Sequence, residues 1–281
     1  MNKNQNLAYK ERIISEHSDI HTTTRGQALI NYTLALYSSK DGAFYGYLRA
    51  WPTDPRIKSE LSIFQVRDPY NVLSILNYSY AFDWSECKSF LGDLVNDEST
   101  YDVFSPVNSS YSTAGGVITL RIALEIFSNL SILEQLDVDG IKEFIKTNQL
   151  SDGGFAQAPW LDQESNLINT QCALWSLSFL DELSAIDIPR VLNFVLGCYH
   201  DGGFAYAPGL ENEYSAVALG LMCLDYLDEM DRIDTEAVFQ YLLNKFDNST
   251  GHWLDGTIVD TERAVWAFSL MGYLDRINQD A

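Results

Sequence analysis

The chain has 281 residues, 46% of them hydrophobic and 20% charged, a balance that excludes wholesale disorder and allows a large buried core. Its 18 Lys and Arg against 39 Asp and Glu give a formal net charge of −21. This excludes a general nucleic-acid-binding surface, because phosphate binding needs clustered positive charge. The N-terminus lacks the apolar core of a signal peptide, and no stretch approaches about 18 apolar residues, so we expect no membrane span. Four cysteines without a C-x-x-C pair are typical of reduced thiols in a cytoplasmic protein.

The N-terminal half is expected to hold three weakly patterned helix pairs, placed by extending backward a repeat that is clear in the second half. Buried, or inner, helices are predicted near Thr23–Tyr37, Pro69–Phe82 and Ser112–Leu130. Amphipathic, or outer, helices are predicted near Leu7–Glu16, Ile57–Val66 and Ser85–Asn96. The largest irregular stretch is expected from Lys40 to Arg56.

The C-terminal half contains the repeat itself. The segment Asp152–Ala156, DGGFA, recurs as Asp201–Ala205, and an Ala-Pro pair follows both copies. Degraded variants stand at Gly251–Trp253 and Asp41–Phe44. Such self-similarity is typical of folds in which one supersecondary unit is stacked many times.

Each glycine turn is predicted to lie between an outer helix and an inner helix. Asp137, Asp187 and Asp234 are expected to cap the outer helices, and the Gly-Gly pair to end them. The inner helices are apolar nearly all round, which indicates burial on every side; they are predicted at Thr170–Leu183, Glu213–Leu227 and Asp260–Leu274. Six such pairs would close into a barrel, a single domain over residues 1–281 with repeats clearest over 130–275.

The copies DGGFA…AP…TQCALWSLSFL and DGGFAYAP…EYSAVALGLMCL resemble the repeats of protein prenyltransferase β subunits. They are also similar to the repeats of squalene cyclases and other class II terpene cyclases. The resemblance implies an all-α fold, the (α/α)6 toroid of inner and outer helices around a central cavity. It further implies an isoprenoid or another apolar small molecule as the ligand, and it leaves open a helical partner subunit.

The zinc triad of the prenyltransferase family is not matched. The family holds Zn²⁺ with an Asp and a Cys two residues apart and a later His, whereas the corresponding positions here are Glu211, Glu213 and a position near Asp260. Carboxylates without Cys or His favour a hard cation such as Mg²⁺. The basic residues with which the family binds the diphosphate are also missing from Ala205–Leu210. The cofactor is therefore open, with Mg²⁺ as the candidate.

The first turns of the inner helices meet at one end of the implied cavity and are the expected site. We expect Asp260 and Glu213 to be catalytic carboxylates at its mouth. The side chains expected to line the substrate are Tyr111, Trp160, Cys172, Tyr206, Tyr214 and Trp253. The alternative interpretation is structural: the aromatic residues belong to the core, Cys172 is a small buried hydrophobe, and Asp260 is an N-cap.

Three functions follow. The first is a prenyltransferase β-subunit-like protein that handles an isoprenoid or similar apolar chain without the usual zinc ligands. The second is a proton-initiated class II terpene cyclase with Asp260 as the acid, since Val259–Ala264 loosely resembles the cyclase motif. The third is a non-catalytic toroid that binds a lipid or a protein. The acidic runs Leu180–Glu182 and Leu227–Asp231 are expected to form a solvated rim, with docking of a basic partner as the alternative.

Overall fold

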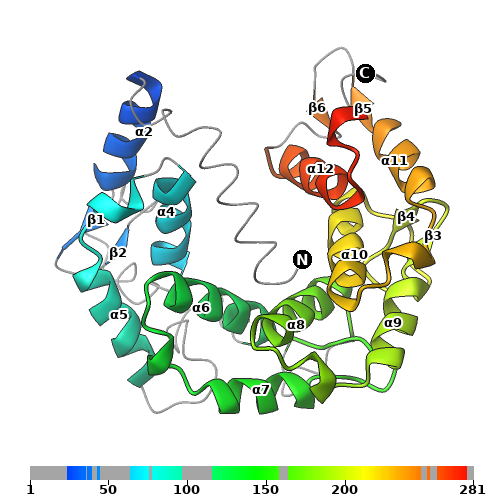
Figure 1. The fold of residues 1–281 in the computed structure, drawn as a ribbon, viewed down its shortest axis with the longest axis horizontal. Coiled ribbons are helices and arrows are strands. Elements are labelled where there is room, and N and C mark those ends of the chain that lie inside the picture. Colours follow the sequence, from blue (N-terminus) through cyan, green and yellow to red (C-terminus); the bar gives the residue numbers. More distant parts are fainter. Residues whose placement is uncertain are drawn as a thin grey trace. The chain divides into compact units, whose positions relative to one another are not determined.

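The computed structural model describes residues 24–35, 37–39, 43–44, 64–75, 78–96, 116–157, 164–247, 252–253 and 258–276, and these are mostly helical (Figure 1). The chain divides into two compact units. The N-terminal unit comprises residues 3–141, and the C-terminal unit comprises residues 142–281 with the first two residues. The helix α7, Val138–Thr147, spans the boundary between them.

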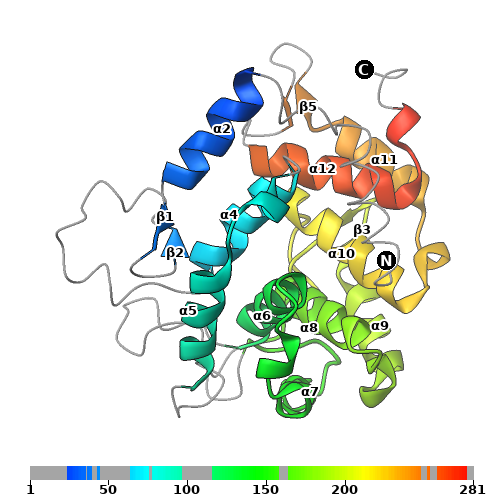
Figure 2. The same ribbon diagram turned by 60° about the vertical axis from the view of Figure 1, so that its left-hand side comes forward.

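Three inner helices lie in a row in the C-terminal unit. They are α8 (Leu167–Phe179), α10 (Tyr214–Leu227) and α12 (Ile258–Met271), and α10 packs against both of the others. The outer helices α9 (Ile188–Gly197) and α11 (Thr235–Leu243) pack against α10 and α12 respectively (Figures 1 and 2). The predicted alternation of inner and outer helices is confirmed in this unit. No helix in the described part of the chain is long and apolar enough to cross a bilayer.

The outer helices begin at the three predicted aspartate caps. The side chain of Asp187 accepts a hydrogen bond from the backbone N–H of Arg190, and that of Asp234 accepts from two backbone N–H groups of α11. Asp137 accepts from the N–H of Gly140 at 2.9 Å. Each carboxylate satisfies N–H groups that the first turn leaves without a helical partner, so these caps are confirmed.

The prediction that the Gly-Gly pair ends each outer helix is wrong. Helix α7 ends at Thr147 and α9 ends at Gly197, before the glycines. The second DGGF segment instead forms the tight turn of a hairpin between β3 (Tyr199–His200) and β4 (Gly203–Phe204). Two more hairpins recur in the chain, and their strands are β1 (Tyr37–Ser38) with β2 (Ala43–Phe44) and β5 (Phe246–Asp247) with β6 (His252–Trp253).

The first glycine of each DGGF segment is required by its backbone and by its neighbour. Gly153 has φ +95° and Gly202 has φ +74°, values that favour glycine. A Cβ on Gly153 would lie 2.1 Å from the carbonyl oxygen of Arg190, and one on Gly202 would lie 2.7 Å from that of Ala237. Both contacted carbonyls belong to the first turn of the next outer helix. The glycine therefore joins consecutive repeats by close backbone contact.

The N-terminal unit holds the inner helices α2 (Thr24–Ala35), α4 (Phe64–Ile75) and α6 (Val117–Asn129), of which α4 contacts the other two. Its outer helix α5 (Ser85–Asn96) has the predicted bounds. Because α4 begins at Phe64, the predicted boundary between Ile57–Val66 and Pro69–Phe82 is wrong, and Pro69 lies inside the helix. The predicted helix Leu7–Glu16 lies outside the described residues.

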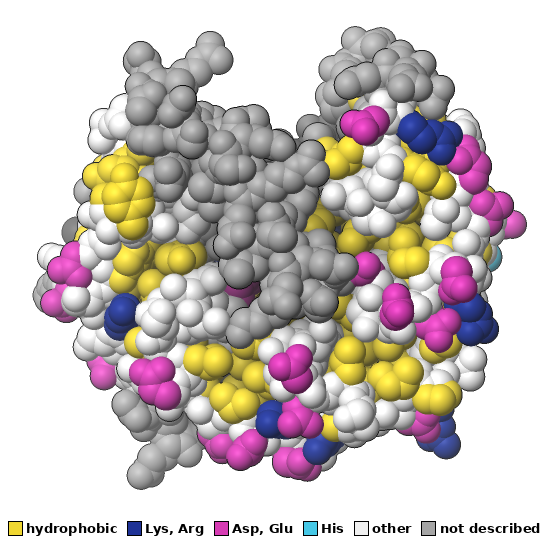
Figure 3. Space-filling view, in the orientation of Figure 1, with side chains coloured by type: hydrophobic (Ala, Val, Ile, Leu, Met, Phe, Trp, Pro, Cys, Tyr) yellow, Lys and Arg dark blue, Asp and Glu magenta, His cyan; other side chains and the backbone are white. Residues whose placement is uncertain are grey.

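The inner helices α6, α8, α10 and α12 end in the same way. Each is followed by a residue with left-handed backbone, at φ +57°, +58°, +58° and +73°; these are Ser131, Asp181, Asp228 and Gly272. A short 3-10 turn comes next: η5 (Leu133–Gln135), η6 (Leu183–Ala185), η7 (Met230–Arg232) and η8 (Leu274–Arg276). Asp181 and Asp228 are exposed, as expected of a solvated rim. On the face drawn in Figure 3, acidic side chains are scattered and do not gather in one patch.

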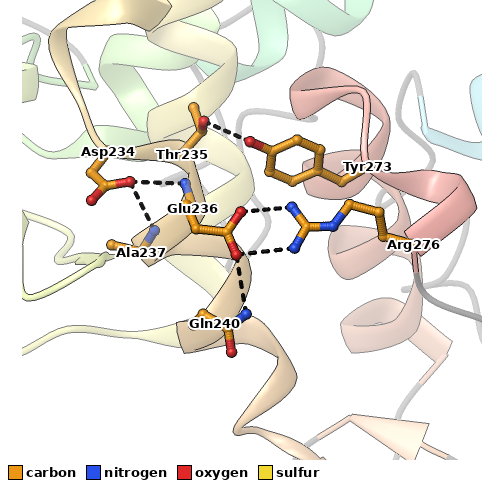
Figure 4. Close-up of polar contacts among 7 residues, drawn as sticks. All are labelled: Asp234, Thr235, Glu236, Ala237, Gln240, Tyr273 and Arg276. Atoms are coloured by element: carbon orange, nitrogen blue, oxygen red, sulfur yellow. Dashed lines mark hydrogen bonds and ion pairs between the residues drawn. The ribbon is translucent and has the colours of Figure 1, made fainter. Parts of the chain in front are cut away.

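The turn η8 is held on α11 by a cluster of polar and aromatic contacts (Figure 4). Arg276 forms two hydrogen bonds to the Glu236 carboxylate, at 2.6 and 3.0 Å, and its guanidinium lies 4.0 Å from the centre of the Phe239 ring. The hydroxyls of Tyr273 and Thr235 are 3.1 Å apart. The bonds from Arg276 and then Gln240 lower the pKa of Glu236 to about 2. This cluster joins the end of the last inner helix to its outer neighbour.

Candidate functional site

The first turns of α8 and α10 are tied together by the loop that precedes α10. The carbonyl oxygen of Tyr206, in this loop, accepts a hydrogen bond from the N–H of Leu167, the first residue of α8, at 2.7 Å. The carbonyl oxygen of Phe204 accepts one from the N–H of Glu213 at 2.8 Å. The loop therefore fixes both helix starts at the same place, as expected for inner helices whose N-termini share one end of the fold.

The first turn of α8 is polar and buried. Asn166 is its N-cap, and its side-chain oxygen accepts the N–H of Asn169 at 2.9 Å. The hydroxyl of Thr170 donates to the Asn166 carbonyl at 2.8 Å and accepts the N–H of Phe155 at 3.1 Å. Gln171 is 4% exposed and donates to the hydroxyl of Tyr226 on α10 at 3.4 Å. Most polar groups of this turn are thus satisfied within the protein.

Asn169 is the exception in this turn. Its side chain is 2% exposed, and its Nδ2 has no hydrogen-bond partner among the described residues. A buried N–H group without an acceptor costs about 1–3 kcal/mol of stability. Such a cost is tolerated where a ligand supplies the acceptor. Asn169 was not among the predicted site residues, although a polar side chain at the start of an apolar helix is a signal that the sequence contains.

Buried thiols and an aromatic pair lie further along the helices: Cys172 and the pair on α8, Cys223 on α10, and Cys198 at the C-terminal end of α9. Trp175 stacks on Phe179 along α8, with ring centres 5.1 Å apart. Cys172 is 4% exposed, and its Sγ lies 3.6 Å from Oε1 of Gln171. Burial raises the pKa of the Cys223 thiol on α10 well above its usual value, and Cys198 and Cys172 add to the shift. Cys223 is therefore a neutral thiol at physiological pH, which disfavours a nucleophilic role.

Two of the predicted lining tyrosines lie at the start of α10. Tyr214 is the first residue of the helix and is 3% exposed. Tyr206 is half-buried, and its hydroxyl lies 2.6 Å from that of Ser215. The backbone of Tyr206 also contacts α8, so the two tyrosines flank the region where the helix starts meet.

Glu213, a predicted catalytic carboxylate, occupies the N-cap position of α10. It is exposed, and its side chain makes no capping hydrogen bond. Burial raises the pKa of Tyr241 on α11, and the nearby charge of Glu213 raises it further, so Glu213 lies close to α11. Glu211, at the other position that corresponds to a zinc ligand, is also exposed. Two exposed carboxylates are not the donor set of a zinc site, and no group of three or more His, Cys, Asp or Glu in the described residues could hold a metal ion.

The remaining predicted residues are only partly described. Asp260 is the third residue of α12, so its interpretation as an N-cap is wrong: the helix begins at Ile258, and the cap must precede that residue. Trp253 lies in β6. The side chains of Asp260 and Trp253 are outside the described part of the structure, as are Tyr111 and Trp160. Their predicted roles stay predictions.

The decisive comparison is with models of protein families. The model described as the prenyltransferase alpha-alpha toroid domain matches residues 19–278. The chain belongs to this family. The predicted all-α toroid and the resemblance to prenyltransferase β subunits are thereby confirmed.

Two relatives of this prenyltransferase-like protein show how far the likeness extends. The geranylgeranyl transferase type-2 subunit beta of Saccharomyces cerevisiae is 30% identical over 166 residues, which cover 58% of this chain and 48% of that protein. The chain therefore matches about half the length of this curated relative. The structure of Candida albicans protein geranylgeranyltransferase-I complexed with GGPP matches with a TM-score of 0.68 at 17% identity, over 89% of this chain and 79% of that chain. At this identity the second match shows the fold alone.

Proposed function

We propose that this prenyltransferase-like protein binds a prenyl diphosphate at the start of α8, with the isoprenoid chain against the apolar side chains of the inner helices. The observation that carries the proposal is the buried Nδ2 of Asn169, which has no acceptor among the described residues. It lies in the first turn of a helix, where the dipole favours an oxygen that carries negative charge. The yeast relative, a geranylgeranyl transferase subunit by name, supports geranylgeranyl diphosphate as the first ligand to test.

The headgroup is proposed to bind with Mg²⁺ and without the zinc triad. Glu211 and Glu213 are exposed carboxylates beside the start of α10, and a bare diphosphate near them would be repelled. Mg²⁺ is held by carboxylates together with phosphate oxygens and would remove that repulsion. Binding should therefore strengthen with Mg²⁺ and respond little to Zn²⁺.

The test is calorimetric titration of the whole chain with geranylgeranyl diphosphate, with and without each metal. Asn169→Leu removes the unsatisfied amide at nearly equal volume. We expect it to weaken binding about tenfold and to raise the free energy of unfolding, because a buried group without a partner is lost. Asn148→Leu is the control: Asn148 is 1% exposed and lies outside the α8 turn, just after α7. Its Nδ2 donates to the carbonyl of Phe144 at 2.8 Å, whereas its Oδ1 has no partner among the described residues.

The outcomes separate the possibilities. The control, which removes a buried amide outside the α8 turn, should bind the ligand with unchanged affinity. No binding to the wild-type chain under any metal condition would exclude the prenyl diphosphate. Normal binding by Asn169→Leu would remove Asn169 from the site while leaving the ligand class intact.

The acceptor and any partner subunit are further parts of the proposal. The yeast relative is named as a beta subunit, so transfer by this chain is proposed to need a second chain. Ile168 and Leu210, at the start of α8 and in the loop before α10, are 36% and 56% exposed and are suitable for such a contact. Ligand binding is tested first because it does not depend on that chain. The cyclase alternative rests on Asp260, and Asp260→Asn with squalene-like substrates would test it separately.

A further inference from the structure

The N-terminal unit contains a cavity of its own, of about 470 Å³. It is lined by residues from the middle of α4, the turn η3 (Ser79–Ala81), the start of α5 and the end of α6. This volume is within the usual range of small-molecule sites. None of its lining residues belongs to the site proposed above.

Aromatic side chains form one part of the cavity wall, beside a polar part. Trp84 is 8% exposed, and its indole N–H donates to the carbonyl of Ser79 at 2.8 Å, which fixes the ring. The centres of the Tyr70 and Phe82 rings lie 5.1 and 4.6 Å from that of Trp84. Tyr80 also lines the cavity and is 77% exposed, an unusual exposure for a large aromatic side chain. An aromatic ligand could therefore contact both a ring that is fixed by a hydrogen bond and a ring that is exposed.

Among the described residues that line the cavity, one side chain carries each charge: Asp83 and Lys88. Asp83 accepts hydrogen bonds from the backbone N–H and the hydroxyl of Ser85, at 3.0 and 2.6 Å, and these bonds lower the pKa of its carboxyl. Lys88 is half-buried in the wall, and its charge is a further cause that lowers the pKa of Asp83, although its Nζ forms no hydrogen bond or ion pair within the described part of the chain. The carboxylate is therefore ionised at neutral pH, and the ammonium group is available to a ligand.

The end of α6 adds a polar edge of backbone acceptors. Asn129, its last residue, and Ser131, with φ +57°, both line the cavity. The carbonyl oxygen of Asn129 accepts a hydrogen bond from the Tyr70 hydroxyl at 3.4 Å. The C-terminal end of a helix favours positive charge, so this edge and Asp83 together suit an ammonium group.

We propose that this cavity binds a small zwitterion with an aromatic side chain, of which an aromatic amino acid is the simplest. Its ring would pack against Trp84 and Tyr80, its ammonium group would contact Asp83, and its carboxylate would contact Lys88. A simple anion would meet Asp83 and the field of a chain with net charge −21, and a simple cation would meet Lys88. Only a ligand with both charges complements the two side chains at once.

The test is a saturation-transfer NMR titration of the full chain with L-phenylalanine, 2-phenylethylamine and 3-phenylpropionate. We expect saturable binding of phenylalanine and, for each analogue, affinity lower by about fivefold because one charge contact is missing. Asp83→Asn keeps the capping oxygen for Ser85 and should weaken phenylalanine and phenylethylamine but not phenylpropionate. Lys88→Met keeps the aliphatic stem and should weaken phenylalanine and phenylpropionate but not phenylethylamine.

Control variants outside the cavity test whether the charge effects are specific to it. Asp93→Asn and Lys146→Met make the same changes at residues that do not line the cavity and should leave the affinity unchanged. Tyr80→Ala should weaken all three ligands, and because this residue is exposed the fold should survive. Absence of saturable phenylalanine binding would overturn the proposal. Phenylethylamine binding as tight as phenylalanine, with no effect of Lys88→Met, would also overturn it in favour of a simple cation site.

Discussion

The inner helices α8 and α10 are two copies of one repeat, yet their first turns differ in chemistry. Both helices have their N-cap backbone N–H bonded to the carbonyl of an equivalent phenylalanine, Asn166 to Phe155 and Glu213 to Phe204. The turn of α8 then buries Asn169, Thr170 and Gln171, whereas the turn of α10 buries Tyr214, Ala216 and Val217. The same backbone arrangement therefore buries polar side chains in the first turn of one inner helix and apolar side chains in the first turn of the next. This difference is the reason that the proposed site is placed on α8.

The largest expected effect concerns the glycine turns that support these two helices. Gly153→Ala should lower the free energy of unfolding by about 3 kcal/mol or more, because the new methyl group would overlap the Arg190 carbonyl at a strained φ. Gly202→Ala has 0.6 Å more room, 2.7 against 2.1 Å, and should cost about 2 kcal/mol. Urea unfolding followed by circular dichroism measures both. Equal losses, or losses below about 1 kcal/mol, would contradict the close contact between repeats.

The next effect separates the polar turn from the apolar one. Thr170→Val should cost about 2 kcal/mol, because the N–H of Phe155 loses its acceptor in a buried place. Thr170 and Val217 are both the fourth residue of their helices. Val217→Thr is therefore the matched reverse change and should cost about 1 kcal/mol, because its hydroxyl can bond to the carbonyl of Glu213 one turn earlier. Chemical denaturation compares the pair, and a larger loss for Val217→Thr would contradict the special role of the α8 turn.

A smaller effect, of opposite sign, is expected where the two helices end. Asp181 and Asp228 adopt left-handed backbone, which glycine adopts without strain, and their charges oppose the helix dipole. Asp181→Gly and Asp228→Gly should each raise the free energy of unfolding by about 0.5–1 kcal/mol. Gly272→Ala, at the equivalent position after α12, should lower it by a similar amount. Thermal unfolding of the three variants checks the series, and destabilisation by both Asp→Gly changes would refute the shared geometry.

The smallest effect depends on pH and concerns the cluster after α12. The Glu236 pKa is lowered from 4.5 to about 2, so its pairing with Arg276 stabilises the fold fully above pH 4.5 and is lost as the pH falls toward 2. The difference in Tm between wild type and Glu236→Gln should therefore be constant from pH 7 to pH 5 and shrink below that. Glu143→Gln removes an exposed carboxylate paired with Lys146 and serves as the control. A difference that grows on acidification would show that the pair does not stabilise the fold.

Much of the fold could be predicted because its signals are local. The aspartate caps act within three residues, and the apolar character of α8, α10 and α12 is visible in each helix alone. The errors arose where a local signal is compatible with more than one structure. The start of α4 was misplaced because Pro69 suggests a helix start, and the glycine pair was assigned to a helix end because glycine at positive φ suits helix ends and hairpin turns equally.

Only part of the candidate site could be predicted from such local signals. The first turns of the inner helices were identified, and Tyr206, Tyr214 and Cys172 do lie at or near the starts of α8 and α10. Asn169 was passed over, because polar residues are common in first turns and most of them find partners. Whether a first-turn side chain of α8 finds a hydrogen-bond partner depends on Phe155, Tyr206 and the loop before α10. These groups approach α8 only in the folded chain.

Composition, the repeated DGGF segment and helix periodicity were sufficient to specify helix pairs, since hydrophobic period and capping act over one or two turns of chain. The family of toroids came from the resemblance of the repeats to those of known proteins. Two features needed the tertiary structure. The packing of Gly153 and Gly202 on the next repeat depends on backbone atoms far along the chain. The unsatisfied amide of Asn169 depends on every group that surrounds it, and hydrogen-bond satisfaction is a property of the assembled interior.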